Sequence, residues 1–198
     1  MAAKSERHGL GGRLPLQDKD RLDDAQRTLY GELMQRRAEA RPFRNATDQG
    51  ELIGPFNAFL HAPQIGAAFL AAHEAEEAHT PLNRQIREIV ILAVGSAWKS
   101  DFEIYAHVAL ASRAGLPDEA VAAILEGREP DLGTDERVAW KFGSELALTH
   151  RVSDETYAAA LRSFGQDGVI AMAFLVALYH GTSVMLNAFD VPAPTDPN

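Results

Sequence analysis

Residues 84–110 read RQIREIVILAVGSAWKSDFEIYAHVAL, and this stretch decides the fold. Apolar residues recur at positions 86, 89, 90, 93, 94 and 97 with the spacing of one helix face, and positions 91, 92 and 95 make the opposite side apolar as well. A helix that is apolar on most sides is buried. After Lys99, a second helix opens at Ser100 with an apolar stripe from Phe102 to Leu110. The stretch therefore predicts two successive helices, of which the first lies inside the protein.

Helical patterns continue on both sides of this stretch, whereas alternating β-branched runs and hairpin turns are scarce. We expect a single-domain, all-α bundle of about eight helices. Thr80-Pro81 is interpreted as the start of the buried helix, and the first residues, up to about residue 18, as a loose arm or a clasp on a partner subunit. The expected parts are an N-terminal arm and helix (1–53), a helical domain (54–192) and an extended tail (193–198). The proline-rich sequence from Val191 onward is expected to be extended and poorly packed. The other predicted helices span 20–40, a short segment from Pro55, 63–78, 118–126, 134–150, 153–164 and 166–188.

Composition excludes several classes of function. The 198 residues are 46% hydrophobic with a formal net charge of -9, which is typical of a globular protein and unfavourable for binding a phosphate backbone. The N-terminus lacks the apolar core of a signal peptide, and the apolar run 169–179 is too short to cross a bilayer. We therefore expect a cytoplasmic protein that binds neither nucleic acid nor membrane.

The chain contains no cysteine. This absence excludes disulfides, thiolate metal sites, iron–sulfur clusters and cysteine nucleophiles.

Three ionisable residues of the opening stretch are candidates for acid–base chemistry. Glu88 lies on the buried helix, so that its carboxylate faces an apolar interior unless it is paired. Glu103 and His107 are one helical turn apart, close enough for the carboxylate to orient or charge the imidazole. Together they predict a site for proton transfer.

Each of the three residues also has a structural interpretation. Glu88 is equally consistent with a partly exposed glutamate in the first helical turn. Ser100-Asp101-Phe102-Glu103 fits a capping box, in which Glu103 only satisfies backbone donors. His107 has apolar helical neighbours and is consistent with a hydrogen-bonded core histidine. The sequence leaves both interpretations open.

The other histidines give no metal site. His73, Glu76, Glu77 and His79 cluster, but their spacing is not that of a known ligand set. We interpret them as a solvated helix face and predict no metal.

The order Glu88, Ser100, Glu103, His107 resembles a family pattern. The carboxymuconolactone decarboxylases and alkylhydroperoxidase-D-like proteins share an all-helical fold, and their redox branch carries a glutamate, a Cys-x-x-Cys pair and a histidine in this order. Here Ser100 and Glu103 occupy the two cysteine positions, so thiol peroxidase activity is excluded. The stretches 54–57 (GPFN), 98–103 (WKSDFE) and 186–192 (LNAFDVP) resemble the cysteine-free branch.

This resemblance implies a homo-oligomer, a trimer or a hexamer, with a site at helix ends near a subunit interface. It implies decarboxylation of a carboxylated muconolactone without any cofactor, since a delocalised dienolate needs only a positioned acid. His107 would then be the proton donor or relay, Glu103 would orient it, and Glu88 would complete the network. Residues implied to bind the substrate are Trp98, Lys99, Ser100, Tyr179 and Asn187, and the candidate cations for its carboxylates are Lys99, Arg84 and Arg87.

Two classes of function remain compatible with the sequence. The first is a carbon–carbon lyase, or a related hydratase or isomerase, that acts on a small lactone or organic acid. The second is a non-catalytic oligomer of the same fold that binds small molecules or is structural. Convergence of Glu88, Glu103 and His107 in one place would favour the first.

Overall fold

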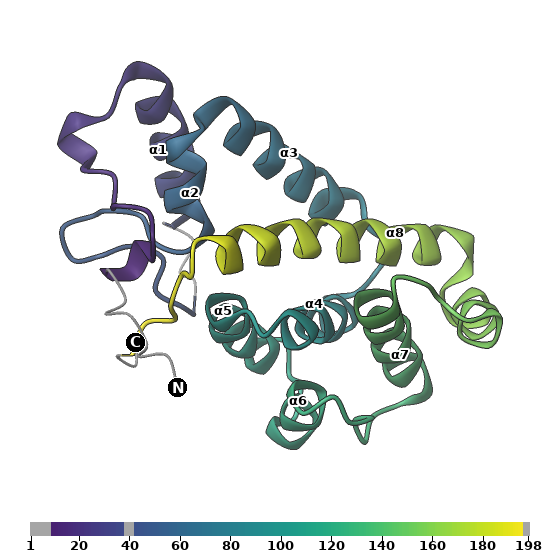
Figure 1. Cartoon of the computed structure of the whole chain (residues 1–198). Coiled ribbons are helices and arrows are strands. Elements are labelled where there is room, and N and C mark those ends of the chain that lie inside the picture. Colours follow the sequence, from purple (N-terminus) through teal and green to yellow (C-terminus); the bar gives the residue numbers. More distant parts are fainter. Residues whose placement is uncertain (1–8, 38–41, 196–198) are drawn as a thin grey trace.

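The computed structural model describes residues 9–37 and 42–195. Its only strand-like pairing in that part of the chain is one isolated bridge between Ala46 and Leu52. The predicted all-α fold with about eight helices is confirmed (Figure 1). The helices are α1 (Asp24–Arg37), α2 (Pro55–His61), α3 (Pro63–His79), α4 (Arg84–Trp98), α5 (Asp101–Arg113), α6 (Asp118–Leu125), α7 (Thr134–Thr149) and α8 (Asp154–Ala188).

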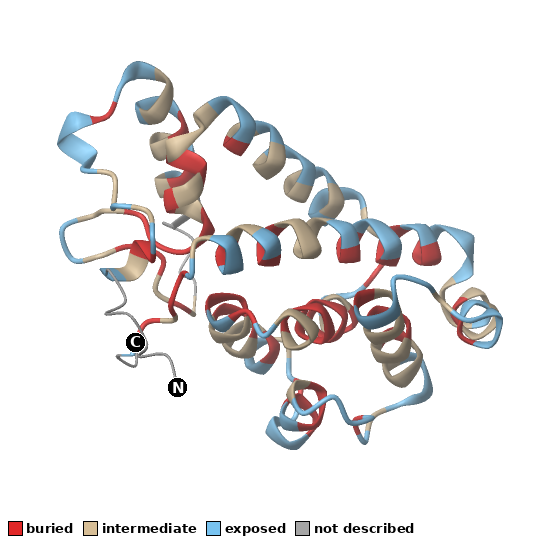
Figure 2. Ribbon diagram, viewed as in Figure 1, coloured by how far each residue is buried: buried red, intermediate tan, exposed pale blue. Residues whose placement is uncertain are grey.

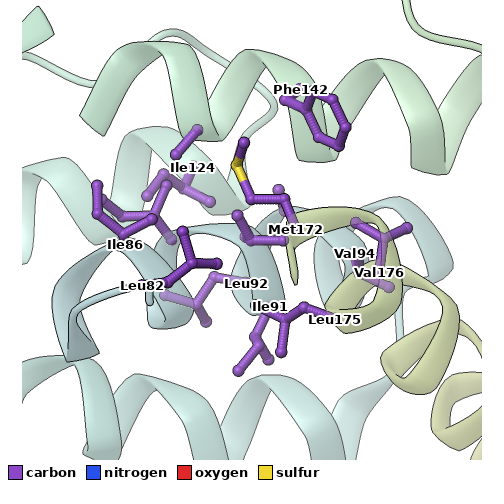
Figure 3. Close-up of a cluster of buried hydrophobic side chains, with 14 of the residues drawn as sticks. Leu82, Ile86, Ile91, Leu92, Val94, Ile124, Phe142, Met172, Leu175 and Val176 are labelled. Atoms are coloured by element: carbon purple, nitrogen blue, oxygen red, sulfur yellow. The ribbon is translucent and has the colours of Figure 1, made fainter. Parts of the chain in front are cut away.

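Helix α4 is the centre of the main core. Helices α5, α6, α7 and α8 all pack against it. Its side chains meet Ile124 of α6, Phe142 of α7 and Met172 of α8 in one buried cluster, part of which Figure 3 shows. Because α4 has neighbours on most sides, burial of its apolar residues stabilises the whole arrangement, which explains its nearly continuous apolar sequence.

A second, smaller core joins α1, α2 and α3. Its buried members include Leu29, Leu33, Phe59 and Leu60. Helix α3 lies alongside α8 (Figure 1), and α8 therefore contacts both cores. This position makes α8 the element that connects the two halves of the fold.

Two predicted helix starts were misplaced. Helix α4 begins at Arg84, where the Asn83 side chain accepts a hydrogen bond from the amide of Ile86 (2.9 Å), so the start proposed at Thr80-Pro81 was wrong. The Thr80 amide instead completes the end of α3. Helix α1 begins at Asp24 and not at residue 20; the predicted end of this helix, residues 38–40, lies outside the described residues.

Gly165 divides α8 into the two helices that the sequence predicts. Its φ of 64° and ψ of -177° interrupt the helix, and the segments before and after it lie at a steep angle (Figure 1). By length and composition alone α8 is able to span a membrane, but 44% of its most apolar window is buried inside the protein. A core helix of a globular protein meets the same criteria, so this observation does not identify a membrane segment.

The described parts of both chain ends pack against the helices. The amide of Arg13 donates to the carbonyl of Phe189 (2.7 Å), and the amide of Gln17 donates to the side chain of Asn57 (3.1 Å). Val191 and Pro194 are buried. A loose arm and a poorly packed tail were therefore wrong for residues 9–18 and 191–195; residues 1–8 and 196–198 lie outside the described part.

A pair of glycine substitutions tests the packing between α2 and α5. Gly54 and Gly165 both have φ near +65° with extended ψ, a region that other residues avoid at a cost of about 1–3 kcal/mol. A Cβ at Gly54 would lie 2.3 Å from Cζ of Phe102, whereas a Cβ at Gly165 would meet nothing within 4 Å. We expect Gly165→Ala to lower the free energy of unfolding by the strain alone, and Gly54→Ala to lower it by roughly 1–3 kcal/mol more. Urea unfolding followed by circular dichroism measures both, and equal losses would contradict the close contact with Phe102.

Candidate active site

Glu88, Glu103 and His107 converge at the contact between α4 and α5. The Nδ1 atom of His107 is 2.7 Å from Oε2 of Glu88, and its Nε2 atom is 3.3 Å from Oε1 of Glu103. The residues are 6%, 3% and 8% exposed, respectively. The structure thus holds one imidazole ring between two buried carboxyl groups, and we name this group the Glu–His–Glu cluster.

The turn between α4 and α5 brings these residues together. Lys99 ends α4 in the left-handed conformation (φ 51°), and α5 then folds back against α4. Gly95 lies against the side chain of Glu103, since a Cβ there would be 3.5 Å from Cγ of Glu103. The reversal places the second turn of α4, which carries Glu88, beside the middle of α5, which carries His107.

The structural interpretations of the two glutamates are not supported by this geometry. Ser100 makes no side-chain capping bond, and its amide donates to the carbonyl of Gly95 (3.1 Å), so no capping box forms. Glu88 is buried and bonded to His107 instead of being partly exposed. Both glutamates therefore contribute to the cluster.

The electrostatics of the cluster favour a charged imidazole. Burial lowers the pKa of His107, but the charges of Glu88 and Glu103 and the hydrogen bond that the ring donates to Glu88 outweigh it, so that the pKa is raised above 6.5. Burial raises the pKa of Glu103 from 4.5 to about 6, and the negative charge of Glu88 adds to this effect while His107 opposes it. Glu103 is thus a carboxyl group that exchanges its proton close to neutral pH.

The two glutamates bind the ring unequally. The contact with Glu88 is a short hydrogen bond, whereas the contact with Glu103 is longer, and Oε1 of Glu103 has no aligned hydrogen-bond partner among the described residues. Glu88 therefore makes the closer contact with His107, and Oε1 of Glu103 makes only the longer ion-pair contact. The roles that the family resemblance implies for the two glutamates stay predictions.

Tyr179 of α8 covers the ring of His107. The two rings meet edge to face with centroids 5.0 Å apart. Burial and the charges of Glu103 and Glu88 raise the pKa of Tyr179 well above 10, which keeps its hydroxyl protonated. Of the five residues expected to bind substrate, Tyr179 is placed directly against the Glu–His–Glu cluster.

The remaining four expected residues lie at the end of α4 and around it. Trp98 donates its indole N–H to Nδ1 of His180 (3.0 Å), and its carbonyl accepts from the side chain of Asn187 (2.7 Å). Lys99 is exposed, whereas Ser100 is fully buried one turn before Glu103. Ser100 therefore shares the face of the cluster, and Trp98 and Asn187 hold α4 to α8.

His73, which was not predicted as a site residue, extends the cluster on the side of α3. Its ring lies 5.1 Å from that of Tyr179, and its Nε2 atom is 3.3 Å from the hydroxyl of Thr182. Burial, followed by the charges of His107 and Arg87, lowers the pKa of His73 to about 4, so the ring is neutral. The only available signal was its position one turn after Phe69 on the inner face of the helix.

The prediction of a solvated face for His73, Glu76, Glu77 and His79 was therefore half wrong. Glu77 and His79 are exposed, but His73 is partly buried and Glu76 forms an ion pair with Arg87. Arg87, one of the candidate cations, is thus already neutralised. Within residues 9–37 and 42–195, no group of three or more histidine and acidic residues is arranged to hold a metal ion.

Two hollows on the described surface lie away from the Glu–His–Glu cluster. Two depressions, of about 300 and 220 Å³, lie between α7 and α8 and share Thr134, Val138 and Arg162. Neither is lined by the Glu–His–Glu cluster. The cluster is identified by its geometry and charge, and not by a large opening.

The coupling between Glu103 and His107 is testable by titration. Because the imidazolium charge lowers the pKa of Glu103, His107→Gln should raise that pKa above its wild-type value of about 6. Nuclear magnetic resonance of the side-chain carboxyl carbons measures the change. Glu145, which is hydrogen-bonded to Ser153 and Thr156, is an internal control whose titration should not move. An unchanged or lower pKa of Glu103 in the variant would contradict the described contact.

Comparison with known proteins agrees with this architecture. Residues 63–145 match the carboxymuconolactone decarboxylase family. An uncharacterised peroxidase-related protein from Ralstonia eutropha JMP134 with an alkylhydroperoxidase core has the same fold, with a TM-score of 0.74 and 18% identity over 92% of each chain.

The debrominase Bmp8 is a second structural neighbour. Its cysteine-to-alanine variant, in complex with 2,3,4-tribromopyrrole, gives a TM-score of 0.70 and 16% identity over 93% of this chain and 92% of that one, and its apo form gives 0.69 and 16% over 92% of each. No curated protein matches at the level of sequence. At these identities the neighbours show the fold alone. Residues 63–145 thus match the carboxymuconolactone decarboxylase family, the chain has the fold of the alkylhydroperoxidase core, and its sequence contains no cysteine.

Proposed function

We propose that the protein is a cofactor-free acid–base enzyme that transfers a proton on a small lactone or related organic acid. The observation that carries this proposal is the imidazole of His107 between two buried carboxyl groups, one of which has a pKa of about 6. Acid–base catalysis is most effective when the pKa of the catalytic group lies near the operating pH.

The cluster supplies both a proton donor and a proton acceptor. Glu88 holds the ring through Nδ1, so the N–H at Nε2 points toward Glu103. A proton can pass between Nε2 and the free oxygen of Glu103, or from either group to a substrate placed beside them. Burial excludes water from these groups and thereby strengthens their electrostatic effect on a reacting molecule.

A decarboxylase-like lyase reaction fits this arrangement. The carbon–carbon bond to the departing carbon dioxide breaks, its electron pair enters the conjugated lactone, and the cluster protonates the resulting dienolate. A hydratase or an isomerase requires the same proton transfer. The family match supports the lyase, and the small heterocycle in the debrominase complex supports a compact organic substrate.

The burial of the cluster favours a second candidate, a non-catalytic oligomer that binds small molecules. A buried charge group also occurs as a purely structural element, because its members satisfy one another. The two candidates differ in whether the cluster exchanges protons with a substrate, and an activity measurement separates them.

Turnover of lactones tests the acid–base function. Carbon dioxide release from γ-carboxymuconolactone and deuterium uptake by unsubstituted lactones in heavy water both report proton transfer at carbon. We expect His107→Gln and Glu103→Gln each to lower the rate at least about 100-fold, because general acid–base catalysis contributes factors of this size. The wild-type rate should change with pH near 6, and this dependence should disappear in Glu103→Gln.

The control is His79→Gln, which changes an exposed histidine on α3 and should leave the rate unchanged. Equal rates in wild type and His107→Gln would refute the proposed role of the ring. If the wild type turns over none of these compounds, the non-catalytic candidate is favoured.

We also propose that the protein self-associates through the outer face of α8. The residues on this face follow helical spacing and include no charged side chain. They are Ile170, Ala173, Phe174, Ala177, Val184 and Ala188, which we name the outer stripe; Gly181, between them, lies against Phe69 of α3. Ile170, Phe174 and Val184 are 45%, 64% and 47% exposed, and Figure 2 shows the exposed positions along α8.

We infer that a second copy of the chain covers the outer stripe. Exposed apolar surface of this extent is costly in water, and the small residues between the large ones let another helix approach closely. The trimer or hexamer implied by the family resemblance would bury it. Helix α8 would then contact the neighbouring subunit with one face and His107 with another.

Substitution of Phe174 tests this proposal. We expect Phe174→Glu to lower the molar mass in solution to that of a monomer, because a carboxylate would be buried against the apolar stripe of a second copy. Light scattering coupled to size-exclusion chromatography measures the mass. Leu148→Glu is the matched control, since Leu148 on α7 is also 64% exposed. A wild-type monomer would refute self-association, and its flotation with lipid vesicles would assign the stripe to a membrane surface.

A further inference from the structure

Three buried oxygen atoms near the contact between α5 and α8 lack a hydrogen-bond partner among the described residues. They are Oγ of Ser100, Oγ of Ser183 and Oε1 of Glu103. Both serines are 0% exposed and Glu103 is 3% exposed. Buried polar atoms are nearly always hydrogen-bonded, so three such atoms in one region indicate that something else binds there.

The two helices place these atoms on facing sides. Ser100, Glu103 and His107 share one face at the start of α5, because they follow the spacing of helical turns. Tyr179, Ser183 and Asn187 share one face of α8 in the same way.

Two contacts fix how these faces meet. The ring of Tyr179 lies against His107, and the side chain of Asn187 binds the carbonyl of Trp98, just before α5 begins. Ser183 lies midway between Tyr179 and Asn187 and therefore stands opposite the turn from Ser100 to Glu103. The three free oxygens thus gather beside the Glu–His–Glu cluster.

The charges around this place have a negative balance. Among the residues that the structure describes, Glu88 and Glu103 contact one positive group, the ring of His107. The charge of Arg87 is compensated by Glu76, and Glu77 adds a further negative charge that acts on Tyr179.

The other basic residues considered do not offset this negative charge. His73 is neutral at physiological pH because its pKa is about 4. The other two candidate cations, Arg84 and Lys99, are exposed. A carboxylate bound here would therefore be repelled, whereas hydroxyl groups and a carboxyl group suit the oxygen atoms of an uncharged molecule.

We propose that this site takes an uncharged, oxygen-bearing small molecule, such as a lactone or an enone without carboxylate groups, whose oxygens accept hydrogen bonds from the hydroxyls of Ser100 and Ser183, and from Glu103 only when its carboxyl group is protonated. This inference rests on the proposed acid–base function and narrows its substrates from lactone acids to uncharged lactones. The corresponding reaction is a proton shift within the molecule, since an uncharged lactone has no carboxylate to lose.

Binding of two related probes to the full chain tests the inference. The uncharged probe is 2(5H)-furanone, and the charged probe is muconolactone, the same ring with a carboxymethyl group. At pH 8, where Glu103 is ionised, chemical-shift titration should give at least about tenfold tighter binding of the uncharged probe, because one nearby charge pair at low dielectric changes affinity by that factor or more.

Variants of Ser183 and Glu103 test whether these residues cause the preference for the uncharged probe. Ser183→Ala should weaken binding of 2(5H)-furanone about fivefold to tenfold, as expected for loss of one hydrogen bond. Ser112→Ala, at an exposed serine of α5, is the matched control and should bind normally. Glu103→Gln should improve binding of muconolactone relative to 2(5H)-furanone, because it removes the opposing charge.

Three results would overturn the inference: equal or tighter binding of muconolactone at pH 8, unchanged affinity in Ser183→Ala, or binding of neither probe. These results are distinct from failure of the proposed function, because binding is measured without turnover. Selective binding of 2(5H)-furanone without any proton transfer would refute the acid–base function but support the proposed binding site.

Discussion

The pairing of His107 with two buried carboxyl groups is the constraint on which the site depends. A carboxylate transferred from water into an apolar interior is costly unless it meets a compensating charge or hydrogen bonds. Glu88 finds both in the short contact with Nδ1 of His107, whereas Glu103 is only partly compensated. The two carboxyl groups therefore differ: Glu88 is hydrogen-bonded to the ring, and burial raises the pKa of Glu103 to about 6, close to neutral pH.

The helical bundle makes this pairing possible by surrounding α4 with other helices. Helix α4 carries Glu88 among residues that are buried on nearly every side, so the carboxylate has few routes to solvent. Helix α5 supplies His107 and Glu103, and α8 covers the ring with Tyr179. Helix α3 adds a second layer of residues, in which Glu76 holds Arg87 and His73 is neutral. The positive charge of Arg87 is thus paired with Glu76, and His73 carries no charge at neutral pH.

The fold was largely predictable from the sequence because helical periodicity is a local signal. The apolar faces of α4 and α8, and the break at Gly165, follow from spacing and from glycine alone. The start of α4 was misplaced because Thr80 and Asn83 are both good capping residues, and only the packed structure selects between them. The ends of the chain were misjudged because their contacts, such as Arg13 with Phe189, join residues far apart in sequence.

The candidate site was only partly predictable, because a sequence pattern reveals contacts within one helix but not contacts between distant helices. The spacing of Glu103 and His107 is local and was sufficient to pair them, and the place of Glu88 on an apolar helix was sufficient to make it a candidate. His73 was missed because its neighbours Tyr179 and Thr182 are on a distant helix and no spacing in α3 reveals them. Similarly, the absence of a capping bond at Ser100 depends on an amide that binds Gly95, which no sequence pattern encodes.

The break at Gly165 has a consequence for how the chain tolerates change. Because the helix before Gly165 is not continuous with the rod after it, the rotation of the rod about its axis is set by its own contacts. Each residue of an α-helix turns the following ones by about 100°. Loss of one residue between Gly165 and Ile170 would therefore be absorbed at the break and leave Tyr179 against His107, whereas loss of one residue between Phe174 and Tyr179 would turn these two side chains by about 100° relative to each other. The length of the rod between Phe174 and Tyr179 thus fixes the direction of the outer stripe relative to the contact with His107.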